Sequence, residues 1–216
     1  MIEPTRGVRL RPMPAKPGRP PRASPSDERL RALRDELQRL TEGTLRSEHA
    51  SAIEAIRGRF GHGIRLVEEN DPNRDVRCVM YALGLAGTYA AELTIGKFPP
   101  AGIVEPRMLE FMIRRKRLHE IEVSPPRGGD LVVYFGDAGV KHAGLVHRGG
   151  VRSKWGDGHV WSHPTMQVPT DYGTSVRYFK RVSLPEALAA HEAYALTRTA
   201  KHTVDAALRP YRGPQS

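Results

Sequence analysis

Cysteine is almost absent from this chain, which has only one among its 216 residues. A single cysteine excludes an intrachain disulfide framework and any zinc site built from several cysteines. Long apolar runs are also missing, since no stretch reaches the ~18 residues that a membrane-spanning helix needs. The N-terminal residues lack the apolar stretch of a secretory signal. We therefore expect a cytoplasmic location, with secretion by a signal-independent route as the alternative.

The charge balance is strongly basic, with 34 Lys and Arg against 24 Asp and Glu and a formal net charge of +10. Such a surplus favours contact with anionic polymers or surfaces. Nucleic acid is thus one candidate partner, though not the favoured one. Hydrophobic residues make up 39% of the chain, enough for a domain with a packed core.

The chain divides into five segments by composition. Residues 1–24 are rich in proline and arginine and predict a disordered basic arm. An N-terminal helical extension is expected over 25–63, a central domain over 64–183, a C-terminal helix over 184–208 and a loose tail over 209–216. Nothing in the sequence indicates the oligomeric state.

Helical signals precede the strand signals along the chain. Leucines at 30, 33, 37 and 40 recur with helical spacing after Pro25, and the resulting stripe is expected to pack on the domain. Further helices are predicted around 47–60, 75–93, 106–118 and 184–207. The last of them begins with Ser183 and Glu186, a capping box.

Strand signals gather in the second half of the chain, at 129–136, 141–147, 151–155 and 175–182. Gly149 and Gly150 separate two of these runs and predict a tight hairpin turn. Helices, then antiparallel strands, then a helix make an α+β arrangement. We expect a central antiparallel sheet packed on the helix that begins near Cys78.

Cys78 stands where the predicted 75–93 helix begins. The free N–H groups of a first helical turn lower a thiol pKa and can hydrogen-bond an oxyanion. Small residues follow at 82, 84, 86 and 87, and they would let a sheet approach the helix closely. The sequence therefore suggests a nucleophile, although free cysteine is also a common buried residue.

His142 is the expected partner of Cys78, because it lies on a predicted strand just before the hairpin. A histidine beside a cysteine can take its proton and return it to a leaving group. Four histidines of this region, at 142, 147, 159 and 163, are possible metal ligands. We disfavour a metal site because His142 and His147 point to opposite faces of one strand, and we expect no cofactor.

The order RCVMYALG, GDLVVYF and KHAGLV resembles the papain-like NlpC and CHAP amidohydrolases. The resemblance covers roughly residues 70–165, and SKWGDGHVWSHP is similar to a signature of bacterial relatives of that fold. It implies a papain-like fold, Cys78 as nucleophile, His142 as base, and a third polar residue that orients the histidine. Arg77 departs from the Asn or Asp that such proteins often carry before the cysteine.

Two residues compete for the third position. If Gly149 and Gly150 form the turn, His142 faces Asp157 across the hairpin, and Asp157 can accept from the imidazole. The SKWGDGHVWSHP signature instead points to His163, with Ser153 and His159 as neighbours. The two tryptophans, Trp155 and Trp161, are expected in the core.

The function expected from these residues is a cysteine peptidase or amidase that works through an S-acyl intermediate. The resemblance implies a peptide or isopeptide amide as substrate, with peptidoglycan as the default, and the missing export signal suits a bacterial effector delivered by other machinery. The alternative is an inactive papain-like binding module that uses its basic surface for nucleic acid or a protein partner.

Overall fold

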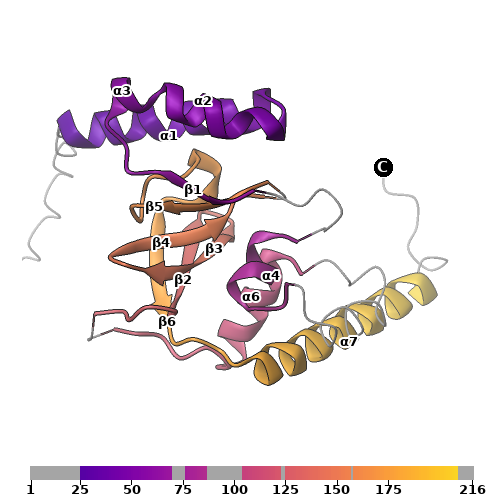
Figure 1. Ribbon diagram of the computed structural model, residues 1–216. Coiled ribbons are helices and arrows are strands. Elements are labelled where there is room, and N and C mark those ends of the chain that lie inside the picture. Colours follow the sequence, from indigo (N-terminus) through magenta and orange to yellow (C-terminus); the bar gives the residue numbers. More distant parts are fainter. Residues whose placement is uncertain (1–24, 70–75, 87–103, 123–124, 157, 209–216) are drawn as a thin grey trace, which may run out of the picture.

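The structure of the chain is a computed structural model that describes residues 25–69, 76–86, 104–122, 125–156 and 158–208. The predicted basic arm and the C-terminal tail lie outside these residues. Along the described chain, N-terminal helices are followed by an antiparallel sheet and a C-terminal helix (Figure 1). This order confirms the predicted α+β class. No helix in the described ranges is long and apolar enough to cross a membrane.

The sheet has six strands in the order β1-β5-β4-β3-β2-β6, and all neighbouring pairs are antiparallel. Its strands are β1 (Arg65–Glu68), β2 (Leu131–Gly136), β3 (Gly139–His147), β4 (Gly150–Lys154), β5 (Val160–His163) and β6 (Ser175–Phe179). The four predicted strands are confirmed as β2, β3, β4 and β6. The sequence analysis did not predict β1 and β5, which pair with each other at one edge.

One face of the sheet is covered by the N-terminal helices α1 (Pro25–Gly43), α2 (His49–Ala55) and α3 (Arg57–Phe60), with a short η1 (Arg46–Glu48) between them (Figure 1). The leucine stripe of α1 packs on this face as predicted, with Leu33, Leu37 and Leu40 buried. The predicted 47–60 helix is broken into η1, α2 and α3. It ends at Gly61, which takes a left-handed φ of 62°.

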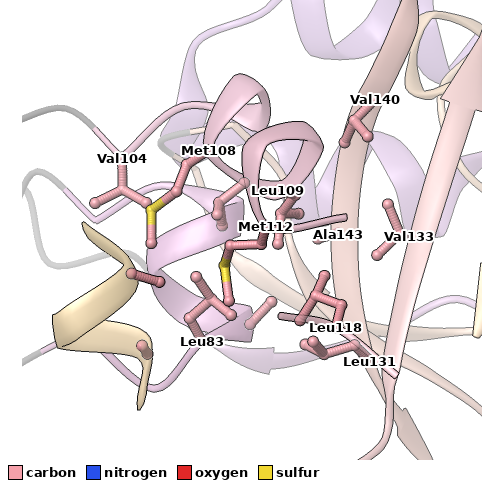
Figure 2. Close-up of a cluster of buried hydrophobic side chains, with 14 of the residues drawn as sticks. Leu83, Val104, Met108, Leu109, Met112, Leu118, Leu131, Val133, Val140 and Ala143 are labelled. Carbon is pink, nitrogen blue, oxygen red and sulfur yellow. The ribbon is translucent and has the colours of Figure 1, made fainter. Parts of the chain in front are cut away.

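The other face is covered by α4 (Cys78–Ala82), α6 (Pro106–Arg114) and α7 (Leu184–Leu208) (Figure 1). Figure 2 shows Leu109 and Met112 of α6 in the same buried cluster as Leu131, Val133 and Ala143 of the sheet. The helix predicted over 106–118 ends early, because Lys116 adopts a left-handed φ of 54°. Glu186 accepts hydrogen bonds from both N–H and Oγ of Ser183, so the Glu186 half of the predicted capping box forms at the start of α7.

Side chains alternate along the central strands and divide the core in two. Leu131 and Val133 of β2 point to the layer of α4, α6 and α7, which we call the Cys78 face. Val132 and Tyr134 point to the N-terminal helices, which we call the His142 face. The candidate residues are distributed over both faces.

Candidate active site

The helix that carries Cys78 is much shorter than predicted. It ends at Ala82, and Gly84 follows with a left-handed φ of 69°. Gly84 N–H bonds to the carbonyl of Tyr81 and Leu85 N–H to that of Met80, the two bonds of a Schellman motif. A Cβ on Gly84 would meet nothing within 4 Å. Gly84 therefore ends the helix. The sequence analysis had proposed instead that Gly84 lets the sheet approach closely, which is wrong. Residues 87–93 of the predicted helix lie outside the described ranges.

The Cys78 thiol is buried between α4 and β3, with 8% of the residue exposed. Burial raises its pKa above the ordinary value, while N–H groups of Ala143, Val79 and Cys78 itself and the charge of Arg77 act in the opposite direction. The predicted lowering of the thiol pKa is therefore wrong for this structure. A five-residue helix has few aligned peptide dipoles, so desolvation outweighs its N-terminus.

Ala143 N–H reaches the thiol because β3 and β4 diverge at this point. The N–H of Val146 bonds to Asp130 beside β2, so the N–H of Ala143, three residues earlier, points to the opposite side, toward β4. The register between β3 and β4 runs only over Leu145–His147 with Gly150–Arg152. Ala143 has no partner in this register, and its N–H is bonded to the thiol of Cys78.

His142 lies next to Ala143 in β3 but points to the other face. Its ring stacks on Tyr172 with the centroids 4.0 Å apart and lies 5.3 Å from the ring of Tyr134, its partner across the strands. Only 1% of the residue is exposed, and its Nε2 is buried without a hydrogen-bond partner among the described residues. Burial, followed by the charge of His163, lowers the pKa of His142 well below its ordinary value.

The structure thus places the Cys78 thiol of α4 beside Ala143, the residue that follows His142 in β3, but does not bring the thiol and the imidazole into contact. Cys78 packs with Ala143 on the Cys78 face, and His142 packs with Tyr134 and Tyr172 on the other. Among the described residues, no hydrogen bond joins the thiol to the imidazole. Burial favours the neutral form of both groups at neutral pH, since it raises the thiol pKa and lowers the imidazole pKa.

His163, one of the two predicted third residues, shares the His142 face and hydrogen-bonds to Ser153. Its Nε2 lies 2.8 Å from Ser153 Oγ and its Nδ1 lies 2.9 Å from the carbonyl oxygen of Pro164. A carbonyl only accepts, so Nδ1 carries the proton and Ser153 donates to Nε2. Because both ring nitrogens are occupied, His163 does not hydrogen-bond to His142, and it acts on the pKa of His142 only through the charge that it carries when protonated.

Asp157, the other candidate, lies outside the described residues, but the register argument for it was wrong. The turn consists of Arg148 and Gly149, both with positive φ, and His147 pairs with Gly150. Extended along the strands, this register sets Trp155 opposite His142, where the predicted turn had set Asp157. Arg148 in a left-handed conformation explains the shift, because two adjacent glycines form the more obvious turn in the sequence.

The tryptophans are core residues, as predicted. Trp155 is 4% exposed and Trp161 is 2% exposed, and their rings lie 5.4 Å apart on the His142 face. His159, predicted beside His163, instead bonds through Nε2 to the carbonyl of Arg46. No cluster of three metal-ligating side chains occurs in the described part of the chain.

The sequence analysis missed two residues, Tyr172, which covers the His142 ring, and Arg34, which holds the loop of Tyr172 in place. Tyr172 lies in the short η2 helix (Thr170–Tyr172), and Arg34 of α1 fastens this loop. The guanidinium of Arg34 donates to the carbonyls of Val168, Pro169, Thr170 and Gly173. Arg34 is 9% exposed although it sits in an otherwise ordinary amphipathic helix. An arginine next to the leucine stripe was the available signal, but nothing nearby in sequence pointed to its partners.

Comparison with known proteins assigns this chain to no family. Neither a family model, nor a curated protein, nor a solved structure matches this chain.

Proposed function

We propose that the protein is a papain-like thiol hydrolase in which Cys78 attacks an amide carbonyl and His142 carries the proton. The observation that carries the proposal is the contact of the Cys78 thiol with the N–H of Ala143, the residue that follows His142. The start of α4 and the strand that carries His142 are thereby held together, although the thiol and the imidazole face opposite sides of β3. The buried Nε2 of His142, which has no partner among the described residues, further supports a catalytic role.

The reaction begins from a neutral pair. The Cys78 proton passes to His142 as sulfur bonds to the carbonyl carbon, and the N–H groups beside the sulfur stabilise the oxyanion. The C–N bond then breaks, and His142 returns the proton to the leaving amine. Water, deprotonated by His142, attacks the resulting thioester and releases a carboxylic acid and the free thiol.

The imidazole must turn toward the thiol for this proton transfer. In this structure the imidazole is held on the His142 face by Tyr172, whose loop is fastened by Arg34. Substrate binding would have to release Tyr172 from the ring. A peptide or isopeptide amide is the proposed substrate class, and peptidoglycan stem peptides are the first substrate to test.

The decisive experiment is digestion of purified peptidoglycan and of peptide libraries by wild type, Cys78→Ser and His142→Gln. New amino groups and released peptides should appear only with the wild type, and intact-protein mass spectrometry should detect an acyl adduct on Cys78. His119→Gln is the matched control, since His119 is exposed. Cleavage that persists in Cys78→Ser would refute the mechanism; an acyl adduct on Cys78 formed from another amide would refute only the peptidoglycan assignment.

The pH profile is a second test of the same proposal. His142 acts as base in its neutral form, and burial lowers its pKa below 6.5. Activity should therefore stay level from pH 8 to about pH 6.5 and fall only below this value. If activity already falls above pH 6.5 as the pH is lowered, the base is a more exposed group than His142.

A non-catalytic binding module is the second candidate, and the burial of both reactive groups favours it. Labelling of Cys78 by iodoacetamide separates the two candidates. In the hydrolase, His142→Gln should change the labelling rate and its pH dependence, because the imidazole takes the thiol proton. Labelling that is unaffected by His142→Gln, together with intact substrates, would support the binding module.

A further inference from the structure

A cavity of about 580 Å³ opens at the edge of the sheet formed by β1, β5 and the β3–β4 hairpin. Neither the Cys78 thiol nor the His142 ring lines it, although His163 does. The lining residues that matter most are Arg65, Leu66, Val67, His147, Arg148, Arg152 and Ser162. Its size is within the range of sites for small molecules.

The cavity is strongly basic. Arg65 comes from β1, Arg148 from the hairpin turn and Arg152 from β4, so three guanidinium groups approach from three elements. No aspartate or glutamate is among the described residues that line it. Within the described part of the chain, neither Arg65 nor Arg148 forms an ion pair. No carboxylate of the described residues therefore neutralises either charge.

Hydrogen bonds fix the orientation of Arg152. Its Nη2 donates to His147 Nε2 over 3.0 Å, which requires a neutral His147. Arg152 also bonds to Tyr81 of α4, and Glu68 of β1 lies close enough to Tyr81 to act on its charge. The pKa of His147 is lowered by desolvation and by the charges of Arg152 and Arg148. The arginines thus already exclude a further positive charge, and an anion would relieve their mutual repulsion.

An apolar wall stands beside the arginines. Leu66 and Val67 are 37% and 40% exposed, and both line the cavity although they are neighbours in a strand. The irregular register between Leu66 and Glu68 explains how both side chains reach the same space. Large exposed apolar side chains beside a basic cavity favour a ligand with an apolar part.

We propose that this cavity binds a small phosphate monoester that carries an apolar or aromatic group, the chemistry of a nucleotide or a phosphorylated metabolite. Arg65, Arg148 and Arg152 bind the phosphate oxygens, Ser162 offers a hydroxyl, and Leu66 and Val67 contact the apolar group. Phosphate fits better than carboxylate, because its three terminal oxygens can accept from donors on several sides. This site does not depend on the proposed chemistry of Cys78.

Calorimetric titration of the full chain with phenyl phosphate tests the proposal. Phenyl phosphate should bind saturably, and more tightly than either inorganic phosphate or benzoate. Arg65→Gln and Arg148→Gln should each weaken its binding about tenfold, the effect of losing one charge-assisted hydrogen bond. Leu66→Ser should weaken phenyl phosphate and leave inorganic phosphate unchanged.

Arg117→Gln is the matched control, since Arg117 is exposed after α6 and does not line the cavity. It should leave the affinity within about twofold of wild type. Equal weakening by Arg117→Gln and Arg148→Gln would show general charge attraction and overturn the site. Saturable binding of benzoate as tight as that of phenyl phosphate would overturn the phosphate assignment, and the absence of binding would overturn the proposal.

Discussion

The two faces of the sheet differ in what they bury. The Cys78 face is packed from methionine, leucine and valine side chains of α6 and the strands (Figure 2), and its α7 also carries the buried His191. The His142 face buries an ordered polar set among its aromatic rings, with His142, His163, Ser153 and Arg34 all at 9% exposure or less. One face is held mainly by apolar packing, whereas the other depends also on neutral histidines and a bound guanidinium.

This difference indicates that the two faces respond to different disturbances. Apolar packing changes little with pH, but buried neutral histidines oppose protonation. The N-terminal helices are therefore structural parts of the His142 face, because they supply both its apolar cover and the arginine that fastens Tyr172. Four predictions, from the largest expected effect to the smallest, can break or sharpen this comparison.

Leu37→Ala should lower the free energy of unfolding by about 2–5 kcal/mol, because Leu37 is fully buried and its loss leaves a cavity under α1. Chemical denaturation should still show one transition if both faces unfold together. Leu45→Ala is the control, since Leu45 is 70% exposed and should change stability little. Two separate transitions would show that the N-terminal helices fold independently of the sheet.

Acid should destabilise the protein through the buried histidines of the His142 face. Burial lowers the pKa of His163 to about 4, so the unfolded chain takes up the proton first as pH falls below 6.5. The contribution of a neutral His163 to stability is thus complete above pH 6.5, and about 3 kcal/mol of it is lost on the way down to pH 4. Denaturation curves at several pH values measure this slope.

His163→Gln should flatten that slope and His119→Gln should leave it unchanged. The two variants compare a buried histidine of the His142 face with an exposed one outside both cores. An equal slope in wild type and His163→Gln would mean that His163 is protonated in the folded protein without cost.

Ser153→Ala should lower stability by about 1–3 kcal/mol, because His163 Nε2 would lose its donor inside the core. Ser162→Ala, on the neighbouring strand and half-buried, makes a suitable comparison for thermal unfolding. Equal melting temperatures for the two variants would show that the bond from Ser153 contributes nothing.

Gly84→Ala should have the smallest effect, a destabilisation of about 1 kcal/mol, from the left-handed backbone at the end of α4. Gly128→Ala is matched to it, since a Cβ there also meets nothing within 4 Å but the backbone is not left-handed. A larger loss at Gly84 than about 2 kcal/mol would mean that the short α4 is more strained than its geometry indicates.

The sequence predicted those elements whose signals are local. The leucine stripe of α1, the capping box at Ser183 and the central strands depend on residues close to one another in the chain, and all were found. The strand β1 was missed because all four of its residues are exposed, so it shows no burial alternation. The strand β5 is only four residues long, too short for a clear period.

The candidate site was only partly predictable, because the face that a side chain occupies depends on register. In β3 the register with β2 shifts between Tyr134 and Phe135, so that Lys141 is an extra residue beside His142. Such a bulge moves every following side chain to the opposite face. The sequence analysis could pair Cys78 with the strand of His142, but the pleat determines the direction of the ring. The burial that raises the thiol pKa is likewise a property of the assembled core.

The contacts of Arg34 also constrain the order of events during synthesis. Its carbonyl partners lie 134 to 139 residues further along the chain. During synthesis, α1 therefore emerges from the ribosome long before the loop that Arg34 fastens has been made. Through most of translation the leucine stripe has no sheet to cover, and it is exposed to chaperones or to other nascent chains.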